Sequence, residues 1–321
     1  MPDNKQYELF CSILSTVVYF DIFSHPLTAA EIKEFAHHSK ATDLEFDEAL
    51  AILVGNKLLF SKNGFYLPHQ KFENIIRRDR GNALAAKTWD KAYKQSVLIS
   101  KFPYVRSVIV SGSLSKGFMD QDSDIDFLII TQPGRLWVAR TLLALYKKVI
   151  LLNSHKYFCV NYFLDSDHFR LPDKNIFIAT ELMFAVPVFN PGMHLRFLES
   201  NSWAREYYPS KKVEIPYLED EFPAPPALKS RLEKLLNGSL GNFADKWMMH
   251  LTVNFWQKKF KTMKKQQYER DMQSHEGVAK HHPNGFRDRV LHEYESRFTE
   301  LKKKIDLIAV GFNAEEPPSL S

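Results

Sequence analysis

The sequence predicts an α+β protein, in which a short mixed β-sheet lies in the middle of the chain with helical segments before and after it. Three apolar segments rich in β-branched and aromatic residues predict the buried strands of that sheet, at 105–110, 125–130 and 156–164. Apolar residues at helical spacing predict the flanking helices. With 321 residues, 45% apolar and 25% charged, the chain is long enough for two or three domains of an ordinary globular protein.

The first 72 residues predict a separate small domain of three helices and a β-hairpin. The expected elements are a helix over 8–20, a second helix that opens with a capping box at Thr28, a third over 43–56 and a hairpin over 58–67. Asn63-Gly64 stands at the centre of the hairpin, where this dipeptide is a strong turn signal. The order of elements resembles a winged-helix domain, a fold that binds DNA or docks on other proteins.

The charge of residues 1–72 helps to choose between these two roles. The segment holds six lysines and no arginine, against nine acidic residues. A domain that reads duplex DNA normally presents a basic face, because contacts with phosphates supply most of its affinity. The sequence therefore predicts a protein partner for the winged-helix-like domain, and DNA is the less favoured partner.

After a long helix predicted from Glu73 to about Ser100, the turn between the first two strands carries residues suited to phosphate and metal. Gly112 lets the backbone approach a ligand, and Ser113 adds an N–H and a hydroxyl for a phosphate oxygen. Asp124 and Asp126 are two residues apart on a strand, so their side chains reach the same face. Two such oxygen ligands suit Mg²⁺, which keeps positions open for phosphate oxygens and water.

The Gly-Ser turn, the ten residues after it and the Asp-x-Asp strand together resemble the nucleotidyltransferase superfamily typified by DNA polymerase beta. The resemblance covers residues 105–165. It is closer to the minimal and antibiotic-modifying bacterial branches, of which Lys116-Gly117 and the Ser-Asp-Ile-Asp core are typical. It implies a nucleotidyltransferase (polymerase beta-like) core with a mixed sheet, flanked by the winged-helix-like domain and a helical C-terminal region.

The resemblance also implies roles for particular residues. Gly112 and Ser113 would lie at the phosphates of a bound nucleoside triphosphate, with Lys116 as a further residue on the phosphate side. Asp124 and Asp126 would hold the Mg²⁺ cofactor. The implied reaction moves a nucleoside monophosphate from the triphosphate, with ATP preferred by its frequency in the family, to an acceptor, and releases pyrophosphate. The acceptor stays open: an antibiotic, a lipid or sugar precursor, a protein side chain or a nucleic-acid end.

Members of the superfamily usually carry a third carboxylate on a later strand, after a helix that is predicted here at 135–152. That position holds Asn161, whose amide brings no charge and is a poor general base. A base could come from Asp165, Asp167 or Glu181, or the reaction needs none. Alternatively, the chain is a catalytically weak nucleotidyltransferase fold that acts as a nucleotide-responsive binding or regulatory protein. Asn161 therefore joins Asp124 and Asp126 as a candidate catalytic residue.

The residues after the sheet predict further helices, at 175–185 and 194–208, and then a proline-rich linker at 216–226. The predicted domains are thus 1–72, 73–215 and a basic helical region at 216–312, followed by a loose tail at 313–321. Between 245 and 304 there are fourteen Lys and Arg residues against eight acidic ones.

Two interpretations of this basic region stay open. The resemblance suggests helices that close over the nucleotide and help to build the acceptor site. The other interpretation is a solvated helical face whose apolar stripe packs inward, formed by Trp247, Leu251, Phe255 and Phe260.

Histidines and basic residues are dense near residue 280. No set of cysteines or acidic residues accompanies these histidines to complete the ligands of a zinc ion. We instead predict a loop there, with Lys280, His281 and Arg287 reaching phosphate or acceptor.

Composition and apolar runs limit the remaining classes. The two cysteines, Cys11 and Cys159, imply no disulfide framework. The longest apolar run, Leu142 to Leu152, is interrupted by two lysines and is too short to cross a bilayer. No leader pattern precedes Tyr7. We therefore expect a cytoplasmic protein with no membrane partner.

Overall fold

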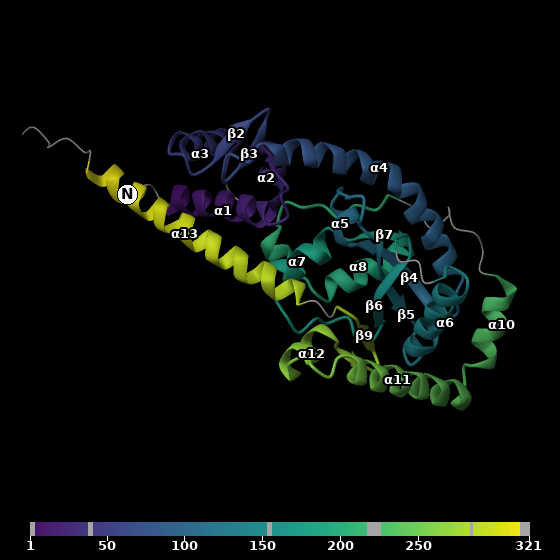
Figure 1. Cartoon of the computed structure of the whole chain (residues 1–321). Coiled ribbons are helices and arrows are strands. Elements are labelled where there is room, and N and C mark those ends of the chain that lie inside the picture. Colours follow the sequence, from purple (N-terminus) through teal and green to yellow (C-terminus); the bar gives the residue numbers. More distant parts are fainter. Residues whose placement is uncertain (1–3, 38–40, 153–155, 217–225, 283–284, 315–321) are drawn as a thin grey trace, which may run out of the picture. The chain divides into compact units, whose positions relative to one another are not determined.

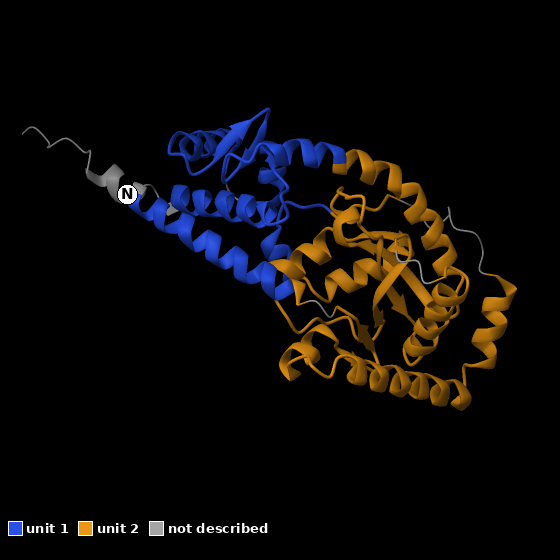
Figure 2. Cartoon of the chain, viewed as in Figure 1, with its two compact units in different colours: residues 1–80, 203–212, 287–321 blue, residues 81–202, 213–286 orange. Residues whose placement is uncertain are grey.

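The computed structural model describes residues 4–37, 41–152, 156–216, 226–282 and 285–314 (Figure 1). The chain forms two compact units (Figure 2). The first comprises 1–80, 203–212 and 287–321, and the second comprises 81–202 and 213–286. Both units draw on separate stretches of sequence, whereas the predicted domain boundaries follow chain order and stay a prediction. The expected linker at 216–226 and tail at 313–321 lie mostly outside the described residues.

The first unit begins with the three predicted helices and two hairpin strands in the expected order, and with one short strand, β1, that the sequence did not predict. They are α1 (Asn4–Asp21), β1 (Leu27–Thr28), α2 (Ala29–Phe35), α3 (Asp43–Gly55), β2 (Phe60–Lys62) and β3 (Phe65–Leu67). The strands form an antiparallel sheet of order β1-β3-β2. Asn63 and Gly64 both have positive φ, as the tight turn between β2 and β3 requires. This order supports the winged-helix assignment, which stays a prediction.

Capping residues explain where the short helices of this unit start. Thr28 and Glu31 form the predicted capping box of α2, with each side chain bonded to the other's backbone N–H. Thr42 and Glu45 form a second capping box at the start of α3. Both boxes satisfy amide groups that a helix leaves free at its first turn.

The second unit is built on a six-stranded mixed sheet of order β7-β4-β5-β6-β9-β8. The strands are β4 (Val105–Ser111), β5 (Asp126–Thr131), β6 (Cys159–Asp165), β7 (Val186–Phe189), β8 (Ser274–His275) and β9 (Val278–Lys280). β5 and β6 are parallel and joined through α6 (Leu136–Val149), and the other neighbouring pairs are antiparallel. The predicted α+β class and mixed sheet are confirmed.

Two parts of this sheet differ from the sequence prediction. β7 lies between the helices predicted at 175–185 and 194–208, where no strand was predicted; it contains Pro187, and an edge strand tolerates proline, which lacks an N–H to donate. β8 and β9 lie where a loop was predicted, and β9 pairs with β6 from Tyr162↔Lys280 to Leu164↔Val278. The predicted loop was wrong because these strands are only two and three residues long, which gives no readable alternation.

Helices accompany the sheet and complete the chain (Figure 1). The predicted long helix is α4 (Glu73–Ser100), and the predicted helix at 194–208 is instead two shorter ones. The remaining helices are α5 (Gly112–Ser115), α7 (Ile176–Met183), α8 (Pro191–Glu199), α9 (Ala204–Tyr207), α10 (Ala227–Leu235), α11 (Ser239–Lys259), α12 (Lys265–Asp271) and α13 (Phe286–Ala314). Among the described residues, no helix combines the length and apolar character needed to cross a membrane.

The helix α11 corrects the prediction of an inward apolar stripe. Trp247, Leu251 and Phe255 are 54%, 50% and 62% exposed, so this part of the prediction was wrong. Trp256 is 4% exposed and packs in the core instead. The helix is apolar on two faces, so spacing alone could not decide which face is buried. Phe260, just beyond the helix, does pack against the core.

Candidate active site

The antiparallel pair β4 and β5 brings the glycine turn directly beside the second aspartate. Ser111, at the end of β4, pairs with Asp126, the first residue of β5. Gly112 follows with a φ of +69°, and a Cβ at this position would lie 2.5 Å from Asp126 Oδ2. A side chain at position 112 would therefore both strain the backbone and collide with the carboxylate, so this turn requires glycine.

Asp124 and Asp126 lie on either side of a fully buried residue. Ile125 and Phe127 are both 0% exposed, whereas the two aspartates are partly accessible. This alternation is the one expected for an extended segment whose apolar side chains enter the core. The two carboxylates therefore share the accessible face, as the sequence predicts.

Asn161 lies next to Asp126. In the parallel pair of β5 and β6, Phe127 aligns with Val160 but Leu128 aligns with Tyr162, so the register shifts at Asn161. The Asn161 Nδ2 donates to Asp126 Oδ1 at 3.2 Å. The position that the resemblance assigns to a third carboxylate is thus beside the aspartates, and it holds an amide that donates a hydrogen bond to one of them.

Lys116 and Glu181 form an ion pair close to the turn. Lys116 Nζ lies 2.8 Å from Glu181 Oε1 and donates to the Gly112 carbonyl at 2.9 Å. Glu181 comes from α7, and both side chains are partly buried. Ser113, the other predicted phosphate contact, follows Gly112 within α5, and its hydroxyl faces the Met119 sulfur at 3.6 Å.

The electrostatics of the site are dominated by negative charge. Burial, together with the nearby carboxylates of Glu181 and Asp124, raises the pKa of Asp126 to about 6, although hydrogen bonds from Cys159 and Asn161 act in the opposite direction. Positive charge added nearby would stabilise the anionic form of this carboxyl group. The site therefore favours a cation.

Lys147 is a basic residue of the site that the sequence did not single out. Burial lowers its pKa, while Cys159 and Asp124 act in the opposite direction. The side chain is therefore close enough to Asp124 to interact with it. In the sequence, Lys147 interrupts an apolar helix, and nothing local to it indicates a role in the site.

The comparison with known families bears on this same segment. Residues 95–180 match the family model of the nucleotidyltransferase domain, a stretch that contains the glycine turn, both aspartates and Asn161. The chain carries a nucleotidyltransferase domain. No curated protein and no solved structure matches the chain.

The three acids considered as alternative bases differ in where they lie relative to the aspartates of the nucleotidyltransferase domain. Asp165 pairs with Thr131 at the far end of β5, about 16 Å along the strand from Asp126. Asp167 follows the end of β6 and is exposed. Glu181 acts on the pKa of Asp126 and so is the one acid of the three beside the pair.

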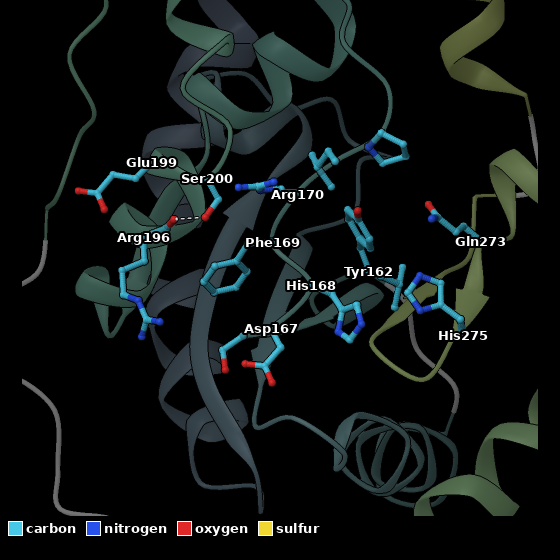
Figure 3. Close-up of a pocket in the computed structure, with 14 residues that line it drawn as sticks. Tyr162, Asp167, His168, Phe169, Arg170, Arg196, Glu199, Ser200, Gln273 and His275 are labelled. Carbon is cyan, nitrogen blue, oxygen red and sulfur yellow. Dashed lines mark hydrogen bonds between the residues drawn. The ribbon is translucent and has the colours of Figure 1, made fainter.

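A separate hollow of about 570 Å³ lies beyond the end of β6 (Figure 3). His168 and His275 lie side by side in it, with ring centroids 5.4 Å apart, and Arg196 and Glu199 of α8 line the other side. None of the residues predicted for phosphate or metal lines this hollow. The candidate nucleotidyltransferase site is therefore identified by its residues and not by this hollow.

The donor set can be tested against the metal that the family generally uses. Within the ranges that the structure describes, no three His, Cys, Asp or Glu side chains lie close enough together to hold a metal ion. Two partly accessible carboxylates are present, and magnesium is commonly bound by one or two carboxylates together with substrate phosphates and water. The pair Asp124 and Asp126 therefore fits a magnesium ion shared with a triphosphate.

Proposed function

We propose that the nucleotidyltransferase domain moves a nucleoside monophosphate from a nucleoside triphosphate to an acceptor hydroxyl or phosphate, in a magnesium-dependent reaction that releases pyrophosphate. The observation that supports this most is the close approach of the Gly112 backbone to Asp126, inside the segment that matches the family. It brings the proposed phosphate turn beside one of the two proposed metal-binding carboxylates. ATP is the proposed donor, by its frequency in the family.

Each residue of the site has a proposed task. Asp124 and Asp126 would hold Mg²⁺, which when bound neutralises charge on the triphosphate oxygens. The backbone at Gly112 and Ser113 would bind phosphate oxygens, since no Cβ blocks the approach at position 112. Lys116 would contribute positive charge from the phosphate side. Catalysis then rests on positioning and charge stabilisation.

Glu181 is the proposed general base. Asn161 cannot accept a proton at neutral pH, and Glu181 is the nearby carboxylate among the candidates. Lys116 Nζ, 2.8 Å from Glu181 Oε1, holds this carboxylate in position. The acceptor oxygen would attack the α-phosphorus, Glu181 would take the acceptor proton, and the bond from the α-phosphorus to the bridging oxygen would break, with pyrophosphate as the leaving group.

The proposed reaction is tested with triphosphates labelled at either the α- or the γ-phosphate, incubated with the full chain, Mg²⁺ and a panel of acceptors from the classes left open by the sequence. Nucleotidyl transfer puts the α-label on the acceptor and the γ-label in pyrophosphate. Transfer of the γ-label to an acceptor would instead indicate a phosphotransferase and contradict the proposal.

The second candidate is a nucleotide-responsive binding protein with little or no turnover, which the amide at position 161 favours. It predicts magnesium-dependent triphosphate binding without label transfer to any acceptor. The first six elements of the chain, in winged-helix order, are then proposed to engage a protein partner. Under this candidate, Asn161→Asp would add the missing charge and strengthen magnesium binding, and Asn161→Ala is the matched control.

A further inference from the structure

One face of α11 exposes a continuous line of large apolar side chains. The five residues recur every three or four positions, so they lie on one side of the helix. They are between 50% and 68% exposed, and we call them the outer stripe: Leu240, Phe243, Trp247, Leu251 and Phe255. The stripe extends about 22 Å along the helix. Three of its five members are aromatic, which is a large apolar surface to leave in water.

The opposite face of α11 is fixed to the second unit, so the stripe does not belong to a frayed helix. Trp256 is 4% exposed, and the Arg140 guanidinium lies 4.5 Å from the centre of its ring. The buried Asp245 accepts a hydrogen bond from the Val138 N–H at 2.9 Å. The core contacts therefore hold the helix in place while its outer stripe faces solvent.

The exposed charges of α11 are all positive. They belong to Lys246, Lys258 and Lys259, and the helix's one acidic residue, Asp245, is buried. Glu276 lies 3.3 Å from Lys246, in a pair that is largely exposed on both sides. The segment that follows adds further exposed lysines at 261, 264 and 265. A binding partner that suits this face of α11 is therefore apolar inside and negatively charged where it meets the water.

The shape of the face favours a bilayer over a protein. A stable protein interface buries about 800 Å² on each partner and centres on side chains that fill pockets. The outer stripe is a single convex helix face. A helix that lies in the membrane interface needs only an apolar face with Trp, Phe and Leu, and basic residues beside it. Trp is enriched at such interfaces, and lysine side chains reach the headgroups from their edge.

We propose that the outer stripe of α11 docks on an anionic lipid bilayer, with its aromatic and leucine side chains in the interface and its lysines at the lipid phosphates. The helix lies on the surface and does not span it. The sequence predicted no membrane partner because its longest apolar run is too short to cross a bilayer, and a helix that lies on the surface need not cross it. This surface is independent of the proposed reaction, so either one can fail without the other.

The test uses the full chain and co-sedimentation with two kinds of vesicle, phosphatidylcholine alone and phosphatidylcholine mixed with phosphatidylglycerol. We expect binding to the mixed vesicles that decreases as salt is raised. Trp247→Ser combined with Phe255→Ser should weaken it about tenfold or more, because apolar burial is lost. Lys258→Glu combined with Lys259→Glu should also weaken it about tenfold or more, since lysines near an anionic surface are attracted to it.

Matched control variants distinguish the loss of this surface from the loss of any exposed apolar or basic side chain. Leu44 on α3 is 68% exposed, so Leu44→Ser removes a comparable apolar side chain elsewhere. Lys87→Glu with Lys94→Glu reverses two exposed charges on α4. Neither control should change vesicle binding. The proposal is overturned if the wild type does not bind anionic vesicles, or if the stripe variants and the control variants bind these vesicles equally well. It is also overturned if the chain self-associates through the stripe, with Trp247→Ser and Phe255→Ser abolishing the oligomer.

Discussion

The parallel strands β5 and β6 have charged side chains at both ends, and the two ends differ in how the acids are paired. At the far end, Asp165 accepts from His168 at 2.6 Å and from the Asp167 backbone N–H at 3.0 Å. At the near end, Asp126 has Asp124 and Glu181 as neighbours, and their charges raise its pKa. Asp165 is paired with two donors, whereas Asp126 has two acids beside it in addition to its donors Asn161 and Cys159.

This difference explains why the near end is the better candidate for a magnesium and triphosphate site. A buried carboxylate with hydrogen-bond donors beside it is stable without a ligand. A group of acids with one paired lysine is stabilised by an added cation. The hollow beyond the end of β6 is lined by none of the residues proposed for magnesium or phosphate, so concavity alone does not identify the site.

The largest expected effect is a difference in transfer activity between variants at the near end and at the far end of β5 and β6. Asp126→Asn should reduce label transfer by about a thousandfold or more, because the charge that holds magnesium is lost. Asp165→Asn is the matched control and should change the rate severalfold at most. Circular dichroism of both variants checks the fold. An equal loss of activity in the two variants would break the comparison.

The next effect concerns the proposed base. Glu181→Gln should lower kcat about a hundredfold, since general bases typically contribute 10²- to 10⁴-fold, while triphosphate affinity stays within about twofold of wild type. Asp167→Asn, an exposed acid outside the site, should leave both kcat and triphosphate affinity unchanged. An unaltered kcat in Glu181→Gln would remove Glu181 from the mechanism.

A smaller effect is expected on stability in the absence of metal. The pKa of Asp126 is raised from 3.8 to about 6, so the fold favours its protonated form. Stability from this group is fully present below about 3.8 and is lost as pH rises through about 6. In EDTA, Asp126→Asn should therefore exceed wild type in unfolding free energy above pH 6, by on the order of 1 kcal/mol, and match it near pH 4. Urea unfolding at both values checks this.

Magnesium with a triphosphate should cancel that advantage at neutral pH, because it stabilises only the wild type. If Asp126→Asn is the less stable protein in EDTA at pH 7.5, the near end does not carry excess negative charge.

The smallest effect lies at the far end. His168→Ala removes one donor to Asp165 and should cost about 1 kcal/mol of unfolding free energy, with transfer activity unchanged. His292→Ala on α13, in the first unit, is the control substitution of another histidine. A loss of activity in His168→Ala would mean that the far end takes part in the reaction.

The sequence predicted those parts of the site whose residues are close together along the chain. Gly112, Asp124 and Asp126 lie within fifteen residues, and one hairpin of strands assembles them, so spacing was enough to predict their arrangement. The pairing of Lys116 with Glu181 joins residues 65 positions apart, and only the packing of α7 against the turn brings them together. Glu181 could be named as a candidate, but its proximity could not be foreseen.

The same distinction applies to the fold. The hairpin at Asn63-Gly64 and the long helix α4 follow from local turn chemistry and periodicity, and both were predicted. β9 depends on its partner β6, which is more than a hundred residues earlier in the chain. The face of α11 that is buried depends on α6, since the helix offers apolar residues on both sides. Tertiary contacts decide such cases, and one sequence does not contain them in readable form.

The most direct test of the site is calorimetric titration of ATP, CTP, GTP and UTP, with and without magnesium, on the wild type and on Asp124→Asn combined with Asp126→Asn. We predict that at least one triphosphate binds in a magnesium-dependent way and that the double variant loses this binding while staying folded. Failure of all four to bind the wild type, or magnesium-dependent binding that persists in the double variant, would contradict the account.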